Sequence, residues 1–141
     1  MLLVSSSAHG KIAEHLAIVE LTRRGHRIAL PVTDDDGVDL IVDYRTTVQV
    51  KNANRTVARP NGYEYTGYTW SNNRARWNAD VFLLHAYEDS SSRWWVVPTS
   101  VLVELGAKSS LNLRNGSRGI GGAIAAHEDR WDIFRSPQPQ G

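Results

Sequence analysis

The 141-residue chain contains no cysteine. A disulfide framework, a thiolate nucleophile and a zinc site built on sulfur ligands are therefore all excluded. Long hydrophobic runs are also missing. The opening run, residues 1–4, is too short for the core of a signal peptide, and no stretch approaches the length of a membrane span. From these absences we expect a soluble protein located in the cytoplasm.

A large excess of charge of either sign is lacking as well. The chain has 16 basic and 15 acidic residues, a net charge of +1, and it is 41% hydrophobic. This balance is typical of a globular domain rather than of a disordered or fibrous chain. The length suits one domain with a real core and is short for two. We expect residues 1–136 to form that domain and residues 137–141 to be a flexible tail.

Helix and strand signals alternate along the chain. Ser7 is placed to cap a helix over residues 8–24, with Gly25 as its stop signal. Strands are predicted at residues 27–31, 38–44, 47–51, 81–87, 93–97 and 111–113. Further helices are expected from Ser71, over 98–106 and around Trp131 and Phe134, with a glycine-rich loop over 115–122. This order predicts an α/β fold in which helices cover a mixed sheet.

The hairpin made by residues 38–44 and 47–51 is the most informative part of the chain. Its apolar residues share one parity along both strands, so matching the apolar faces constrains the register. The matched register predicts a three-residue loop, 44–46, and places Asp39 opposite Lys51. A two-residue turn at 45–46 would instead separate Asp39 from Gln49 and Lys51. The predicted second face is mostly polar and carries Asp39, Ile41, Asp43, Thr47, Gln49 and Lys51.

An acid and a lysine placed together at the end of a sheet suit metal-assisted hydrolysis of a phosphodiester bond. A carboxylate binds a hard divalent cation through oxygen. The cation can lower the pKa of a bound water and hold phosphate oxygens. A nearby lysine can stabilise charge on the phosphate or orient the attacking water. The alternative for such a pair alone is an ordinary salt-bridged hairpin, because pairs of this kind are common.

Four short segments, taken in order, resemble the PD-(D/E)XK nuclease superfamily. They are Gly-Lys-Ile-Ala-Glu at 10–14, Pro31, Gly-Val-Asp-Leu at 37–40 and Gln-Val-Lys at 49–51. The pattern looks most like the small members, the group I intron homing endonucleases and the archaeal Holliday junction resolvases. The resemblance implies a restriction-endonuclease-like mixed central sheet flanked by helices. It also implies an endonuclease that hydrolyses DNA with Mg²⁺, for which Mn²⁺ can substitute.

The resemblance also assigns the site residues. In that family a glutamate on the first helix, an aspartate on the second strand and an acid-x-Lys pair on the third form the site. The matching positions are Glu14, Asp39 and Gln49 as catalytic metal ligands, with Lys51 as the catalytic lysine. Two departures stand out, because Val38 replaces the proline before the aspartate and Gln49 replaces an acid. Some intron-encoded members look similar in using a glutamine there.

Two further functions stay open beside a homing or restriction-like endonuclease. One is a Holliday junction resolvase-like nuclease, which would prefer branched DNA whatever its sequence. The other is a catalytically inactive DNA-binding protein with the same fold, because a glutamine carbonyl can bind magnesium but brings no charge. Cutting both strands of a duplex needs two active sites, so we expect a homodimer or higher homo-oligomer.

A basic segment follows the proposed site. Residues 45–79 hold six basic side chains and one acid, a local charge of +5, with asparagines and aromatic residues between them. Arginines hold phosphates, asparagines can read adenine edges and aromatic rings can stack on bases. The alternative is a basic hairpin whose aromatic residues only pack it down. The segment predicts a double-stranded or branched DNA partner bound through Arg45, Arg55, Arg59, Arg74 and Arg76.

The remaining candidate sites have ordinary explanations. Three acids at 34–36 before Gly37 fit either a metal cluster or a solvated turn. The five histidines lack metal-ligand spacing, and His85 inside an apolar strand is expected to be a hydrogen-bonded core residue. The glycines at 119–122 follow no clear strand, which argues against a nucleotide-binding loop.

Overall fold

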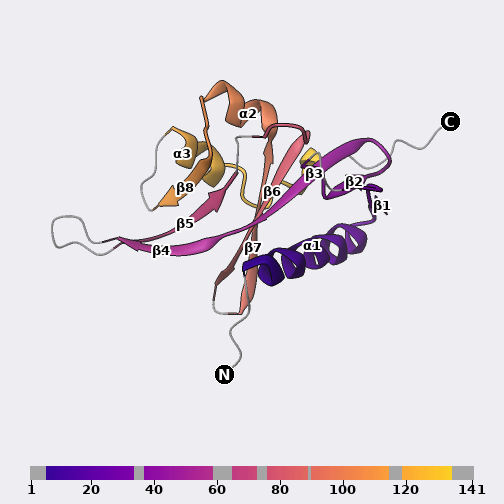
Figure 1. The fold of residues 1–141 in the computed structure, drawn as a ribbon, viewed down its shortest axis with the longest axis horizontal. Coiled ribbons are helices and arrows are strands. Elements are labelled where there is room, and N and C mark those ends of the chain that lie inside the picture. Colours follow the sequence, from indigo (N-terminus) through magenta and orange to yellow (C-terminus); the bar gives the residue numbers. More distant parts are fainter. Residues whose placement is uncertain are drawn as a thin grey trace.

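The computed structural model describes residues 6–33, 37–58, 65–72, 76–88, 90–114 and 119–134. Two sheets organise the chain: a five-stranded sheet in the order β1-β2-β3-β6-β7 and a three-stranded sheet in the order β4-β5-β8 (Figure 1). The elements are α1 (Ser6–Arg23), β1 (Ile28–Ala29), β2 (Leu40–Val42), β3 (Thr46–Asn52), β4 (Asn54–Ala58), β5 (Tyr65–Ser71), β6 (Val81–Glu88), β7 (Ser91–Pro98), α2 (Thr99–Glu104), β8 (Ser110–Arg114), α3 (Ile120–Ala125) and the 3₁₀ turn η3 (Trp131–Ile133).

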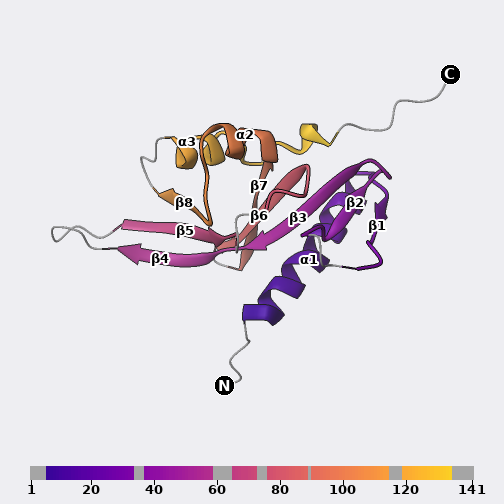
Figure 2. The ribbon, with the colours of Figure 1, turned by 45° about the horizontal axis from the view of Figure 1, so that its top comes forward.

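The five-stranded sheet is mixed. Its central strand β3 runs antiparallel to β2 and parallel to β6, which pairs antiparallel with β7. Helix α1 packs along β3 on one side, while α2 and α3 lie with β8 on the other (Figures 1 and 2). The predicted α/β fold, a mixed sheet flanked by helices, is therefore confirmed. Within the described residues, no helix combines the length and the hydropathy that a bilayer crossing requires.

Each face of the sheet has its own core. On the α1 side, Ala13, Ala17 and Leu21 are fully buried with the alternate side chains of β3 and β6. On the other side, Trp70 and Trp95 are fully buried and their rings meet edge to face, 5.2 Å apart. Because both faces are covered, most side chains in the middle of the sheet are apolar and closely packed.

Helix α1 agrees with its sequence signal at one end only. Gly25, with φ of +92°, follows its last turn as expected. The helix begins at Ser6, however, so Ser7 lies inside it and does not precede it as a cap.

Three other local predictions were wrong. Ser71 ends β5 instead of starting a helix, because β5 pairs with β4 on one side and β8 on the other. Residues 120–122, predicted as the end of a loop, begin helix α3 (Ile120–Ala125), in which Ile124 is buried in the core despite two glycines. The expected final helix is only the turn η3. In each case long-range packing outweighs local propensity.

The β2–β3 hairpin has the predicted loop length in a different register. Leu40 pairs with Val48, and the loop is 43–45, one residue earlier than predicted. The register therefore places Asp39 opposite Gln49, and the predicted pairing of Asp39 with Lys51 was wrong. A shift of two residues leaves every side chain on its face, so apolar patterning could not distinguish the two registers.

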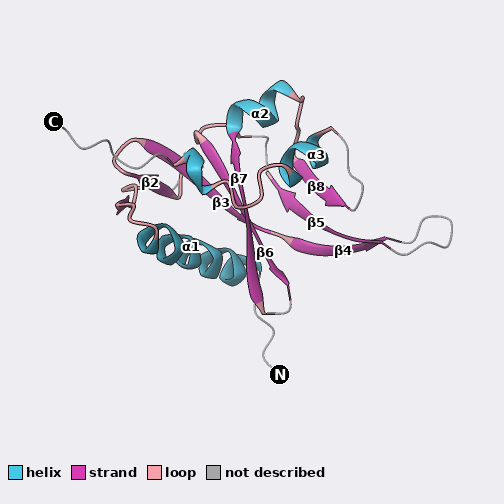
Figure 3. Ribbon diagram, turned by 180° about the vertical axis from the view of Figure 1, so that it is seen from behind, coloured by secondary structure: helices cyan, strands magenta, loops and turns pink. Residues whose placement is uncertain are grey.

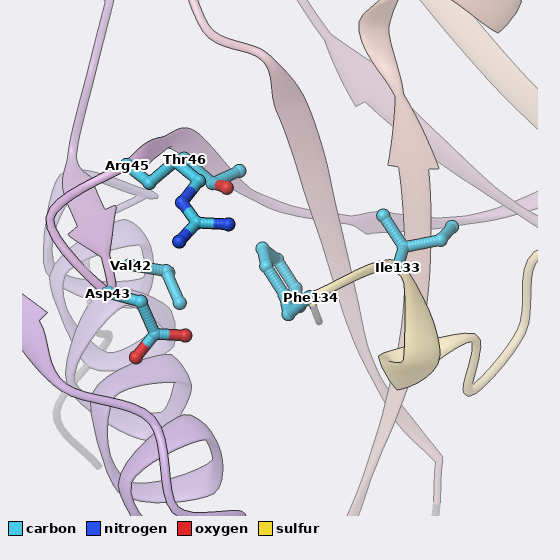
Figure 4. A pocket seen from close by; sticks show the side chains of 6 residues that line it. All are labelled: Val42, Asp43, Arg45, Thr46, Ile133 and Phe134. Carbon is cyan, nitrogen blue, oxygen red and sulfur yellow. The ribbon is translucent and has the colours of Figure 1, made fainter. Parts of the chain in front are cut away.

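Asp43 explains the observed register. Its carboxylate accepts hydrogen bonds from His26 Nδ1 at 2.7 Å and from the Arg27 backbone N–H at 2.9 Å. Burial raises the pKa of the Asp43 carboxyl, but these hydrogen bonds outweigh burial and hold the pKa below its ordinary value. With Asp43 tied to the segment before β1, the hairpin must turn at this residue, which adopts φ of 53°. The turn also lines a shallow pocket beneath η3 (Figure 4), made by Val42, Asp43, Arg45, Thr46, Ile133 and Phe134.

Removing the Asp43 carboxylate should destabilise the protein in a pH-dependent way. We expect Asp43→Ala to lower the free energy of unfolding at neutral pH by roughly 1–3 kcal/mol, because the buried His26 ring and the Arg27 backbone N–H lose their acceptor. A carboxyl whose folded-state pKa is lowered stabilises above its unfolded value and stops doing so as the pH falls through the folded value. Urea denaturation of the wild type and of Asp43→Ala at neutral and acidic pH measures this. The difference between their free energies of unfolding should shrink as the pH falls.

Asp132→Ala is the matched control for this prediction. The Asp132 carboxylate pairs with Arg130 on the surface, where its side chain is 66% exposed. An exposed ion pair of this kind adds little stability. Equal losses in Asp43→Ala and Asp132→Ala at neutral pH would show that the buried contacts of Asp43 do not stabilise the hairpin.

Candidate active site

Asp39 lies where β2 separates from β3. Its backbone N–H donates to the Val48 carbonyl at 2.8 Å, a bond just outside the ladder, in which Val48 is the partner of Leu40. Its side-chain Oδ2 then accepts a hydrogen bond from the Val50 N–H, also at 2.8 Å. The side chain thus takes the place of a strand partner for Val50. This bond holds the Asp39 carboxylate at the fork between the two strands.

Glu14 reaches the same fork from α1. Buried Ala13 and Ala17 hold the helix against the sheet, and Glu14 stands at the edge of that buried stripe. Burial raises the pKa of the Glu14 carboxyl, and the negative charge of Asp39 raises it further. Lys11, one turn earlier on the helix, opposes the shift. The two carboxyl groups are therefore close enough to influence each other's protonation.

The charged groups of the cluster are incompletely compensated. Burial raises the pKa of the Asp39 carboxyl, although the Val50 N–H, Lys51 and Lys11 oppose the shift. Burial also lowers the pKa of the Lys51 ammonium, and Asp39 only partly opposes that shift. In both groups the charged form is disfavoured in the folded protein. A dication bound by the carboxylates would reverse this for Glu14 and Asp39.

Gln49 supplies a third oxygen. Its Oε1 atom is buried and has no hydrogen-bond partner within the described residues. The amide packs against Gly37, where an added Cβ would lie 3.7 Å from both Nε2 and Oε1. An unpaired buried carbonyl is unfavourable, so such an atom calls for a partner. It lies on β3 at the register position opposite Asp39.

These oxygens fit a hard divalent cation. Carboxylate and amide oxygens are the ligands that Mg²⁺ and Ca²⁺ prefer, and here they come from α1, the start of β2 and β3. Among the described residues no group of three or more His, Asp and Glu side chains could hold a metal. A cation in this cluster would therefore rely on the Gln49 amide together with Glu14 and Asp39.

The structure brings these four predicted site residues to one fork, while Arg45, one of the predicted DNA-binding arginines, lies apart from it. Arg45 is exposed in the hairpin loop, six residues from Lys51 and so roughly 20 Å away along the strand. Arg76 is half-buried before β6, and its carbonyl accepts a hydrogen bond from Asn72. Arg55 belongs to β4, but its side chain lies outside the described residues, as do Arg59 and Arg74. The DNA interface stays a prediction.

One further prediction has a clear outcome. His85 is a buried core residue as predicted, with Nδ1 bound to Asn52 and Nε2 to Ser92, both at 2.8 Å. Burial lowers the pKa of His85 to about 4, so it is neutral at physiological pH. Trp95 and Trp131 are buried in the core as well. The acids at 34–36 lie outside the described residues.

The sequence analysis missed Lys11. Its Nζ lies 3.5 Å from Glu14 Oε2, and its charge acts on both Glu14 and Asp39. The signal was present, because residues three apart on a helix share a face. The spacing of three residues between Lys11 and Glu14 therefore predicts that the two side chains are neighbours on the helix.

Comparisons with known proteins agree with this arrangement. The sequence model of the family described as PD-(D/E)XK endonuclease matches residues 4–129. The solved structure of a bacterial homing endonuclease, I-Ssp6803I, is similar with a TM-score of 0.70 and 22% sequence identity. The likeness covers 93% of this chain and 91% of that chain, and at this identity it shows the fold. No curated protein matches the sequence.

The raised pKa of Glu14 should be visible in the stability of the metal-free protein. A carboxyl whose folded-state pKa is raised makes the protein less stable as the pH climbs from its unfolded value, about 4.3, through the folded value. We therefore expect Glu14→Gln to raise the melting temperature at neutral pH in a chelating buffer. The gain should vanish in acid, where both forms are neutral.

Glu20→Gln on the same helix is the control, because Glu20 pairs with Arg24 near the surface. Thermal denaturation across a pH series compares the two variants. If Glu14→Gln lowers the melting temperature at neutral pH by as much as Glu20→Gln does, the pKa of the Glu14 carboxyl is not raised in the folded protein.

Proposed function

The chain belongs to the PD-(D/E)XK endonuclease family, and from that premise we propose that it hydrolyses DNA with Mg²⁺ bound at the β2–β3 fork. The observation that carries the proposal is the buried Gln49 Oε1, which has no hydrogen-bond partner in the described part of the chain, together with two carboxyl groups whose ionised forms are disfavoured. Two carboxyl groups, only partly compensated by Lys11 and Lys51, and a buried amide oxygen suit a hard dication, for which Mn²⁺ can substitute.

Each residue has a role that follows from its position. Glu14, Asp39 and Gln49 would hold the cation, which supplies Lewis acidity toward water and phosphate oxygen when it is bound. Lys51, half-buried beside Asp39, presents its ammonium to the phosphate and to the attacking water. Water adds to phosphorus, one P–O ester bond breaks, and the leaving oxygen takes a proton. No described carboxylate lies within ion-pair distance of Lys51, so its donors are available.

We further propose that the enzyme is homing- or restriction-like and acts as a homodimer on duplex DNA. The fold similarity to a bacterial homing endonuclease supports this choice, and a duplex cut needs two sites. A Holliday junction resolvase-like nuclease is the second candidate, which would prefer branched DNA. An inactive DNA-binding protein is the third, and the missing charge at Gln49 is the observation that favours it.

Cleavage of supercoiled DNA in Mg²⁺ or Mn²⁺ tests the activity. We expect nicked and linear products from the wild type and at least a ~100-fold slower reaction in Asp39→Ala and in Lys51→Ala, since each removes a group acting on the transition state. Asp132→Ala and Lys108→Ala remove exposed charges of the same kind and should cleave normally. A branched DNA substrate run in parallel separates the resolvase from the homing-like enzyme.

Two outcomes would reject the proposal. Unchanged cleavage by Asp39→Ala would place the active site elsewhere. Salt-sensitive DNA binding without any metal-dependent breaks, on supercoiled and branched DNA alike, would favour the inactive DNA-binding protein.

Substitutions at Gln49 test the third ligand without relying on activity. Gln49→Met removes the unpaired carbonyl, so we expect it to raise the metal-free free energy of unfolding by about 1 kcal/mol and to abolish stabilisation by Mn²⁺. Gln49→Glu adds a charge, so it should destabilise the metal-free protein and bind Mn²⁺ more tightly. Thermal denaturation with and without Mn²⁺ measures both effects. Undiminished Mn²⁺ stabilisation in Gln49→Met would remove Gln49 from the ligand set.

A further inference from the structure

The Lys11 ammonium would compete with a bound metal cation for the Glu14 and Asp39 carboxylates. Its Nζ lies 3.5 Å from Glu14 Oε2, and its charge acts on Asp39 as well. Lys51, on β3, adds a second positive charge that acts on Asp39. When all four groups are ionised their charges cancel, so Lys11 and Lys51 together supply the positive charge that a dication would supply.

The bond between Lys11 and Glu14 is easily broken. The separation is long for an ion pair, and the Lys11 side chain is 66% exposed. Ion pairs of this kind within a helix contribute little to stability, and water solvates the exposed Lys11 ammonium whether or not it is paired. A dication bound to Glu14 and Asp39 would repel the Lys11 ammonium from the same oxygens. The Lys11 side chain can therefore move away from Glu14 with little loss of stability. The half-buried Lys51 side chain has less freedom to move.

We propose that Lys11 is an exchangeable counter-ion, which holds Glu14 in the metal-free protein and turns to a DNA phosphate once a divalent cation takes its place. The inference rests on the proposed metal-dependent function. A lysine carries a flexible four-carbon stem and a compact charge, so it suits a role with two partners. With the cation bound, the four side chains and the ion together carry two positive charges, which favours a phosphate beside Lys11.

The proposal predicts that Lys11→Gln strengthens metal binding and weakens DNA binding. Lys11→Gln removes the competing cation, so Mn²⁺ should bind about three- to fivefold more tightly, a factor in keeping with an exposed ion pair. The same change should weaken DNA binding, but only when a divalent cation is present. A purely structural role for Lys11 would not tighten metal binding. Lys11→Arg keeps the charge and should restore DNA binding.

The experiment uses the full chain and two probes. Isothermal titration with Mn²⁺ measures metal affinity for the wild type, Lys11→Gln and Arg23→Gln, the last removing an exposed charge from the far end of α1. Fluorescence anisotropy with a short DNA duplex measures binding at several salt concentrations, once with Ca²⁺ and once with chelator. The slope of log DNA affinity against log salt concentration reports the number of phosphate contacts. We expect Lys11→Gln to lower that number by about one in Ca²⁺ and to leave it unchanged in chelator.

The outcomes separate the two proposals. If the wild type binds Mn²⁺ and Lys11→Gln binds it no more tightly, the counter-ion role is wrong while the metal site stands. If Lys11→Gln weakens DNA binding equally with and without Ca²⁺, Lys11 is a permanent phosphate contact and the exchange is wrong. If the wild type does not bind Mn²⁺ at all, both the proposed function and this inference are overturned.

Discussion

The hydrogen bond from the Val50 N–H to the Asp39 carboxylate is the interaction on which the site depends. It takes the place of a strand–strand bond just before β2 begins, so the ladder stops at Leu40 and a carboxylate is held at the opening. Because Asp39 is fixed there, it lies near two side chains on the same face of β3. These are Gln49, its register partner, and Lys51, the next residue on that face. A longer β2 would pair Val50 by its backbone and leave no fork.

The same arrangement leaves the cluster in an unfavourable state without a cation. Burial disfavours the charged forms of Glu14, Asp39 and Lys51, and Gln49 has a buried oxygen without a partner. Proteins tolerate such local conflict where function requires it and compensate elsewhere. Here the compensation lies in the apolar cores on the two faces of the sheet, which hold the strands rigidly enough to keep these groups together.

Much of the site was readable from the sequence, because its signals are local. Alternation with a period of two placed Asp39, Gln49 and Lys51 on one face, and the match to a known family singled out Glu14. The strands around residues 81–87 and 93–97 were equally clear, since runs buried on both faces are apolar throughout. In the basic segment the sequence offered a hairpin only as an alternative, and it did not predict the strands β4 and β5, because β5 pairs with the distant strand β8 (Figure 3).

The sequence by itself determined which residues face the site, and only the tertiary structure decided which of them meet. A shift of two residues preserves every apolar contact pattern, so the hairpin register could not follow from patterning. It follows from Asp43, whose carboxylate is held by His26 and Arg27, sixteen or more residues away in the chain. The contact of Lys11 with the acid pair likewise needed α1 to be docked on β3, because side-chain charge acts through space and not along the chain.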